Sequence, residues 1–328
     1  MGTGHVMRMI ALADRIRGAG GEVCLAAVGL DETLERRAGS HGVEVVRGDL
    51  VAGSGEDGRW VAQLAAEREI DWVAADGYAF GERFQEAARE RGARLLLADD
   101  YGHSPRYTAE IVLNQNLSAD ARVYENRAAQ TRLLLGPRYA LIRSEFLDRL
   151  PDRPPVAERA RRILVTMGGA DPDNATSKIL DALGRVADPE LRARVVIGPS
   201  NPNAELLARG TDDPRVELVP ARDGMVELML WADLAIAGAG ITTHELCFMG
   251  VPSMLVVLAD NQLEVSRSLD HEHAGENLGW HHELEVDDVA GRIAELCSSP
   301  ERRREMIARG GALVDGLGSA RVLEAMSP

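Results

Sequence analysis

The chain has 328 residues, of which 45% are hydrophobic and 27% are charged, and its formal net charge is −15 at pH 7. This composition is typical of a folded globular protein and excludes a disordered chain. The acidic balance excludes a general binding surface for nucleic acid or for an anionic membrane, so any anionic ligand needs a local pocket.

The chain begins with a histidine flanked by glycines, Gly2-Thr3-Gly4-His5, which opens a helix with apolar residues at helical spacing. The two glycines let the backbone turn sharply and approach a ligand closely, and the helix offers its positive end at the same place. His5 is therefore a candidate catalytic residue and Gly4 a candidate ligand contact. The alternative is a histidine that only caps the helix or lies on the surface.

The first half of the chain alternates short apolar runs with helical patterns. This alternation predicts parallel βαβ units with helices on both faces of a sheet. The expected strands are 22–27, 43–46, 72–75, 94–98 and 111–113, and the expected helices begin at residue 31 and span 59–68 and 80–91.

Polar residues follow three of these strands. Ligands gather at the carboxyl ends of strands in such sheets, and these ends carry Asp76-Gly77-Tyr78, Asp99-Asp100-Tyr101-Gly102-His103 and Asn114-Gln115-Asn116. Asp99 and Asp100, with His103, are candidates for a second acid–base group or for positioning water. Capping of the next turn is an equally good interpretation.

A strand is expected ahead of the first helix, because the glycine-rich turn of this architecture leads from a central strand into that helix. Only Met1 precedes Gly2. We expect that the true start lies upstream, since removal of a central parallel strand leaves unpaired backbone groups and an open sheet. Loss of the strand from this chain is the alternative.

A proline-containing stretch at 147–161 predicts a linker, because prolines do not continue a helix. We therefore expect two domains, 1–150 and 151–328, a division that suits about 150 residues per domain. The expected strands of the second domain are 163–167, 193–197, 215–219, 234–237 and 253–257, and its last helices begin at Asp287 and Pro300. The predicted fold class is α/β, with two doubly wound Rossmann-like domains facing each other across a cleft.

The second domain contains a sharper motif, Gly238-Ala239-Gly240-Ile241-Thr242-Thr243-His244-Glu245, between a strand and a helix. Small residues expose successive backbone N–H groups, threonine hydroxyls add donors, and the helix dipole favours an anion. We therefore predict a diphosphate site. It is formed by Gly240, Ile241, Thr242 and Thr243.

Glu245 lies about one turn into that helix, where its carboxylate can accept hydrogen bonds from a ribose diol. The alternative is an ordinary strand-to-helix turn with Glu245 in solvent. A second glycine turn, Gly168-Gly169, is expected at the same cleft as His5.

Several motifs occur together in one order along the chain. They are Gly2-x-Gly4-His5-Val6-Met7-Arg8, Asn114-Gln115-Asn116, Gly136-Pro137-Arg138-Tyr139-Ala140-Leu141-Ile142-Arg143-x-Glu145-Phe146, Met167-Gly168-Gly169-Ala170-Asp171-Pro172 and Leu258-Ala259-Asp260-Asn261-Gln262. With them the chain resembles the PseG family of UDP-sugar hydrolases, which are related in fold to MurG-type GT-B glycosyltransferases. The resemblance runs from Gly2 to about Gln262. Family members carry an Arg-x-Asp element on a strand before the histidine motif, and this sequence has none.

The resemblance implies hydrolysis of UDP-2,4-diacetamido-2,4,6-trideoxy-β-L-altropyranose in pseudaminic acid biosynthesis, with inversion and with no metal or other cofactor. His5 matches the catalytic histidine that orients or deprotonates water, and Tyr78 matches a residue that holds the sugar. Asn261 would contact the sugar or its phosphate, and Glu245 the ribose. Val219 to Arg222 would offer backbone groups to uracil.

Two other functions remain open at this point. A GT-B glycosyltransferase would pass the sugar from the same donor to an acceptor other than water, and fold alone does not separate the two activities. A non-catalytic protein would bind the nucleotide sugar and release no UDP. Histidine pairs at 271, 273, 281 and 282 suggest a metal, but no cysteine or carboxylate pattern supports one.

The location expected from the sequence is the cytoplasm. The three cysteines lie far apart, which is typical of reduced thiols. The first residues lack a continuous apolar run, and no stretch approaches the ~20 apolar residues of a membrane span. The sequence leaves the oligomeric state open.

Overall fold

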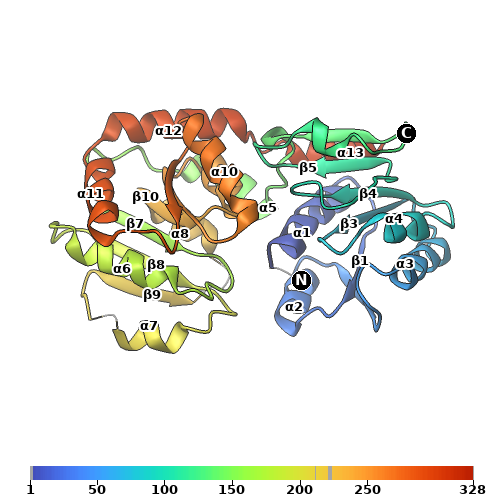
Figure 1. Ribbon diagram of the computed structural model, residues 1–328, viewed down its shortest axis with the longest axis horizontal. Coiled ribbons are helices and arrows are strands. Elements are labelled where there is room, and N and C mark those ends of the chain that lie inside the picture. The colour runs from blue at the N-terminus through green and yellow to red at the C-terminus, as the bar shows by residue number, and fades with distance from the viewer. Residues whose placement is uncertain (1–2, 211, 221–223, 328) are drawn as a thin grey trace. The chain divides into compact units, whose positions relative to one another are not determined.

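The computed structural model describes residues 3–210, 212–220 and 224–327, and it divides the chain into two compact units (Figure 1). The first unit contains residues 1–144 and 316–328, and the second contains residues 145–315. Each unit is an α/β domain whose paired strands are parallel. The expected fold class of two Rossmann-like domains is therefore confirmed.

The strands of the first unit form two separate sheets. One sheet has the order β1-β2, and the other has the order β3-β4-β5-β6. The elements of this unit are α1 (Thr3–Gly18), β1 (Cys24–Val28), α2 (Glu32–Ser40), β2 (Glu44–Gly48), α3 (Gly55–Glu67), β3 (Trp72–Asp76), α4 (Glu82–Ala88), β4 (Arg94–Ala98), β5 (Ile111–Asn114), η1 (Ala121–Tyr124), β6 (Arg132–Leu135), η2 (Pro137–Tyr139) and α13 (Gly318–Met326).

The second unit has one six-stranded sheet with the order β12-β11-β10-β7-β8-β9. Its apolar core joins residues of the central strands to α6 and α11. Its elements are η3 (Leu150–Asp152), β7 (Arg162–Thr166), α6 (Ala175–Arg185), β8 (Arg192–Ile197), α7 (Ala204–Gly210), β9 (Val216–Pro220), α8 (Met225–Trp231), β10 (Leu234–Gly238), α9 (Thr242–Met249), β11 (Ser253–Val257), α10 (Asp260–His271), β12 (Glu276–Trp280), α11 (Val286–Cys297) and α12 (Pro300–Leu313); the short α5 (Ser144–Leu147) spans the unit boundary.

The C-terminal helix α13 belongs to the first unit, whereas the expected division at 150/151 assigned the whole C-terminal part to the second domain. The indole N–H of Trp72 on β3 donates a hydrogen bond of 2.9 Å to the carbonyl of Met326. A side chain at Gly318 would clash with the carbonyl of Ala140, since a Cβ there would lie 2.1 Å from that oxygen. These contacts hold the end of the chain against the first unit.

Helix α1 spans the two sheets of the first unit. Its residues Val6, Ile10 and Ala13 belong to one apolar cluster with β1 and α2. Its Leu12, with Ala11, belongs to another cluster with β4, β5 and α13. Because α1 packs on both sides, the position of its first turn is fixed by the core.

Replacement of Leu12 by alanine should lower the free energy of unfolding by about 2 to 5 kcal/mol, because it leaves a cavity under α1. Leu12 is buried, whereas Arg15 on the same helix is exposed. Arg15→Ala is therefore the matched control and should change stability by less than about 0.5 kcal/mol. Equal losses for both variants in urea unfolding would contradict the packing described here.

Candidate active site

The first turn of α1 meets the carboxyl ends of β3 and β4. His5 lies in that turn, and its Nδ1 is 2.7 Å from Oδ1 of Asp76, the last residue of β3. The His5 side chain is 13% exposed, whereas that of Asp76 is 2% exposed. A buried carboxylate therefore faces one nitrogen of a partly accessible imidazole. If Nδ1 carries the proton and donates it to Asp76, Nε2 is left as the acceptor.

Arg8 lies one turn after His5 and joins two carboxylates. Its guanidinium donates to Asp76, with Nη2 at 2.6 Å from Oδ1, and to Asp100, with Nη1 at 2.7 Å from Oδ1. Burial alone would lower the pKa of Arg8, but the two carboxylates outweigh it and raise the pKa. Burial would likewise raise the pKa of Asp100, but Arg8 holds it below its ordinary value. Arg8 and Asp100 are therefore both charged at neutral pH.

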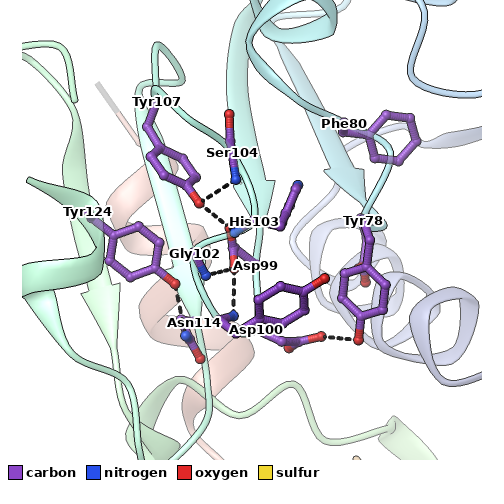
Figure 2. A network of polar contacts seen from close by, with 12 residues as sticks. Tyr78, Phe80, Asp99, Asp100, Gly102, His103, Ser104, Tyr107, Asn114 and Tyr124 are labelled. Carbon is purple, nitrogen blue, oxygen red and sulfur yellow. Dashed lines mark hydrogen bonds and ion pairs between the residues drawn. The ribbon is translucent and has the colours of Figure 1, made fainter. Parts of the chain in front are cut away.

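Two tyrosines lie beside this charged cluster, and Figure 2 shows one of them, Tyr78, next to Asp100. The hydroxyl of Tyr78 donates a hydrogen bond of 3.0 Å to Oδ2 of Asp100, and the Tyr78 ring meets the His5 ring edge-on, with the centroids 4.9 Å apart. Tyr78 is 43% exposed and Tyr101 is 50% exposed, and their ring centroids are 5.2 Å apart. The structure thus brings the expected residues His5 and Tyr78 together, with accessible aromatic surface next to them.

Asp99 points away from this cluster and organises the turn after β4 (Figure 2). It accepts backbone hydrogen bonds of 2.7 Å from Tyr101 and from Gly102, and a hydroxyl hydrogen bond of 2.5 Å from Tyr107. Nδ1 of His103 lies 3.0 Å from its Oδ2. Burial would raise the pKa of Asp99, but these interactions outweigh it and hold the pKa at about 2. Of the two interpretations from the sequence, the geometry favours the capping one for Asp99.

The polar residues after β5 connect strand ends rather than facing outward. Asn116 donates from Nδ2 to the carbonyl of Asp100 at 3.2 Å, and Asn114 donates from Nδ2 to the Tyr124 hydroxyl at 2.9 Å. The Gln115 side chain accepts from the backbone of Leu141 at 3.1 Å. This segment therefore fixes the loop that carries Asp100.

In the second unit, three expected turns follow neighbouring strands. The turn 168–169 follows β7, the turn 238–243 follows β10, and the segment 259–262 follows β11. In the sheet β10 lies between β7 and β11, and the chain order reverses between β7 and β10. Such a reversal creates a crevice at the carboxyl ends, where open α/β sheets bind their ligands.

The turn before α9 keeps two backbone amides available. The amides of Gly240, Thr243 and His244 donate within the turn, and the Thr243 hydroxyl donates 2.8 Å back to the carbonyl of Gly240. The described residues give the amides of Ile241 and Thr242 no acceptor. These two amides at a helix amino terminus are suited to bind an anion. Thr243 instead stabilises the turn.

The other residues expected in this site have distinct surroundings. Glu245 is buried, at 8% exposure, in the first turn of α9, and Asn261 is exposed at the start of α10. Gly168 has a φ of +84°, which favours glycine, and the Gly169 carbonyl accepts a hydrogen bond of 3.0 Å from the amide of Ser200. Gly2, Ala221 and Arg222 lie outside the described residues.

Sequence reasoning missed Asp76, Arg8 and Asp100 as one unit. Asp76 was recognised only as a polar strand end, and Arg8 only as part of a motif. The spacing of His5 and Arg8, three residues apart in a helix, was the available signal that both face the same way.

No group of three histidine, cysteine, aspartate or glutamate residues within the described ranges is arranged to hold a metal ion. Likewise, no helix within those ranges is long and apolar enough to cross a membrane.

Replacement of Asp99 by asparagine should make the protein less sensitive to acid. The pKa of Asp99 is about 2 in the folded protein, against 3.8 ordinarily, so its charge stabilises the fold above about pH 4, and this is lost as pH falls towards 2. The difference corresponds to about 2 kcal/mol. The pKa of His103 is raised, so it stays protonated in this range. In urea unfolding, the free energy of unfolding of the wild type should fall more steeply than that of Asp99→Asn as the pH is lowered. Parallel falls in the two proteins would contradict the stabilising role assigned to the Asp99 carboxylate.

Residues 162–314 match the family model for the glycosyltransferase family 28 C-terminal domain. Two curated relatives extend the similarity to more of the chain. The chain is 28% identical over 277 residues to an uncharacterized protein, MJ1062, of Methanocaldococcus jannaschii; the alignment covers 80% of this chain and 54% of that protein, so the chain spans about half the length of this relative. It is 25% identical to the spore coat polysaccharide biosynthesis protein SpsG of Bacillus subtilis, over 98% of this chain and 93% of that protein.

Solved structures show the same fold. MurG of Acinetobacter baumannii superposes with a TM-score of 0.67 at 17% identity, covering 98% of this chain and 96% of that one. Alr3699/HepE of Anabaena, solved in complex with UDP and glucose, superposes with a TM-score of 0.65 at 17% identity, covering 98% and 95%. The chain therefore has a GT-B fold, and residues 162–314 of its second unit match the glycosyltransferase family 28 C-terminal domain.

Proposed function

We propose that the chain is a UDP-sugar-dependent enzyme that cleaves the bond between the sugar C1 and the diphosphate with inversion. The observation that carries this proposal is the His5–Asp76 pair, a partly accessible imidazole oriented by a buried carboxylate. Such a pair is suited to general base catalysis on an O–H nucleophile. The GT-B fold and the match to glycosyltransferase family 28 favour a nucleotide sugar as substrate.

In this proposal the first unit activates the nucleophile. Nε2 of His5 takes the proton from an attacking O–H group, its oxygen bonds to C1, and the bond from C1 to the diphosphate oxygen breaks. Asp76 stabilises the imidazolium that forms. The tyrosine rings of Tyr78 and Tyr101 provide apolar surface for the sugar, and UDP leaves from the face opposite to attack.

The second unit binds the leaving group. Negative charge develops on the diphosphate as the C1–O bond breaks, and donors already in place stabilise that charge. The amides of Ile241 and Thr242 and the amino end of α9 are such donors. Gly240, Gly168 and Gly169 keep the backbone accessible to the phosphates. The carboxylate of Glu245 binds the ribose hydroxyls, and Asn261 contacts the sugar or its phosphate.

We favour glycosyl transfer to a hydroxyl acceptor, because the family match and the similarity to MurG concern glycosyltransferases. Hydrolysis is the second candidate. The ordered motifs that resemble the PseG family favour it, with UDP-2,4-diacetamido-2,4,6-trideoxy-β-L-altropyranose as substrate and water as nucleophile. The chemistry at His5 is the same in both cases, so the nucleophile alone distinguishes them.

UDP release decides between these candidates. The purified chain is incubated with the diacetamido substrate, and separately with UDP-GlcNAc, each with and without a panel of sugar and lipid-linked acceptors. Release that requires an acceptor supports transfer, and release from the diacetamido sugar in water alone supports hydrolysis. A folded protein that binds UDP and releases none under any of these conditions would refute both.

His5→Ala should lower kcat by about 10²- to 10⁴-fold, because the general base is lost. The chain offers a matched control in His41, whose Nδ1 lies 3.0 Å from Oδ2 of Asp14 and whose side chain is 14% exposed. This second histidine–aspartate pair lies at the end of α2, just before the amino end of β2 and not at the carboxyl end of a strand. His41→Ala should leave kcat unchanged. If kcat falls by a similar factor in the two variants, His5 is not the general base.

Ile241→Pro tests the diphosphate site, because proline has no backbone N–H group to donate to the ligand. Ile241 has a φ of −56°, which proline adopts, and the preceding residue, Gly240, has no Cβ to clash with the proline ring. Loss of one charge-assisted hydrogen bond should weaken UDP binding by about 10- to 100-fold in calorimetry. Ile241→Val keeps the amide and should bind UDP as the wild type does. If the proline variant binds UDP as tightly as the wild type, the amide of Ile241 does not belong to the diphosphate site.

A further inference from the structure

Two turns of the first unit carry the accessible tyrosines of the candidate site. The turn 77–81 follows β3 and carries Tyr78, and the turn 99–104 follows β4 and carries Tyr101. β3 and β4 are neighbouring parallel strands, so both turns lie at the carboxyl edge of the same sheet. Contacts between the two turns therefore decide how the two tyrosine rings lie.

The side chain of His103 lies between these turns, and Figure 2 shows it between the Asp99 turn and Tyr78. It is only 6% exposed, and its Nδ1 is 3.0 Å from Oδ2 of Asp99 in its own turn. Its ring centroid is 6.1 Å from that of Tyr78 and 6.1 Å from that of Tyr101. One buried imidazole is thus in ring contact with both accessible tyrosines.

Groups from both turns favour the protonated form of His103. Burial would lower its pKa, but the carboxylate of Asp99 and the backbone carbonyl of Phe80 outweigh burial and raise the pKa above the ordinary 6.5. Asp100 favours the protonated form as well. Asp99 belongs to the turn after β4, whereas Phe80 belongs to the turn after β3. The charge on the ring therefore attracts both turns at once.

This attraction depends on charge more than on hydrogen bonding. Both ring nitrogens of His103 are buried, and within the residues that the structure describes neither forms a hydrogen bond of ordinary geometry. The other groups that face the ring are the two tyrosine rings and, across Asp99, the hydroxyl of Tyr107, which donates to that carboxylate at 2.5 Å. A neutral imidazole here leaves two buried nitrogens poorly paired, which is costly.

The turn of Tyr78 is anchored at Phe80, two residues further on. The Phe80 ring packs on Phe84 of α4, with the ring centroids 4.4 Å apart. The side-chain amide of Gln85 donates to the Phe80 carbonyl at 3.4 Å, which is a long hydrogen bond. An imidazolium is a stronger partner for that carbonyl, because interactions with a charged donor exceed those between neutral groups.

We propose that His103 is a positioning residue that holds the turn of Tyr78 in place, so that the Tyr78 ring stays beside His5. We call this contact the imidazole clamp. The clamp is closed while His103 is protonated, and it loosens when the ring loses its proton. A second general base is the other role open to a histidine here, but the burial of both ring nitrogens prevents contact with a substrate.

The direction of the pH dependence follows from the raised pKa of His103. A group whose pKa is higher in the folded protein stabilises the fold fully below its ordinary pKa, here 6.5. This stabilisation is lost as the pH rises through the higher pKa of the folded protein. The clamp is therefore closed in mildly acidic solution and opens on the alkaline side.

Backbone relaxation measured by ¹⁵N NMR tests the clamp without any substrate. At pH 6 the amides of the turn 77–81 should have order parameters near ~0.85, as a rigid backbone does. His103→Gln keeps a polar N–H group but carries no charge, and it should lower these order parameters to ~0.6. Raising the pH of the wild type above the His103 midpoint, which labelled histidine ring signals report, should have the same effect without any substitution.

His41→Gln is the matched control for this experiment. Nδ1 of His41 also lies 3.0 Å from an aspartate oxygen, Oδ2 of Asp14, and its loss should leave the turn 77–81 rigid. Order parameters that stay unchanged both in His103→Gln and in the wild type above the midpoint would overturn the proposal. An equal loss of order in His41→Gln would overturn it as well.

Asp99→Asn tests the source of the charge on the ring. Removal of the carboxylate should lower the midpoint of the His103 signals, because the ion pair that favours the protonated ring is lost. An unchanged midpoint would show that Asp99 does not hold the imidazolium, and the clamp would then lack its partner in the turn after β4.

The kinetic consequence rests on the proposed function, whereas the clamp itself does not. His103→Gln should raise KM for the nucleotide sugar about 3- to 10-fold, because one aromatic contact with the sugar is loosened. It should change kcat by less than about twofold and leave UDP binding in calorimetry unchanged. A fall in kcat with an unchanged KM would contradict a positioning role. The relaxation result needs no activity, so failure of the clamp and failure of UDP release are distinguishable.

Discussion

The buried guanidinium of Arg8 is the interaction on which the candidate site depends. It joins the first turn of α1 to the ends of β3 and β4 by binding Asp76 and Asp100 together. A buried charge is tolerated only where partners of opposite charge compensate it. Removal of one partner leaves an uncompensated buried charge, which destabilises the fold. Arg8 therefore fixes Asp76 in the place where it meets His5, and Asp100 where it meets Tyr78. The reactive geometry follows from an ion pair in the core of the first unit.

The two units carry different parts of the proposed chemistry. In the first unit, charged side chains at strand ends orient an imidazole. In the second unit, backbone amides and a helix terminus form the proposed anion site at the point where the strand order reverses. A proposed base and a proposed leaving-group site thus follow from one structural rule, that parallel sheets present ligand-binding groups at their carboxyl ends. The same rule applies to both units, but side chains provide the proposed ligand-binding groups in the first unit and backbone amides provide them in the second.

Much of the fold could be predicted from the sequence, because buried parallel strands are short apolar runs between helices. β6 and β12 were not predicted. β12 lies at the edge of its sheet and contains Glu276, which is buried and paired with Arg292 at 2.7 Å, so its sequence is not an uninterrupted apolar run. The return of α13 to the first unit depends on contacts between distant segments, such as Trp72 with Met326. The pairing of Arg8 with Asp76 and Asp100 is equally non-local, and no local pattern encodes it.

The stereochemistry of the product tests the central claim most directly. The diacetamido substrate, or UDP-GlcNAc with its effective acceptor, is converted by the purified chain while proton NMR follows the anomeric signal. A single displacement assisted by one base at His5 predicts that the first product formed has the anomeric configuration opposite to that of the substrate. A first product with retained configuration would require a covalent intermediate or front-face reaction, and it would contradict the role assigned to the His5–Asp76 pair.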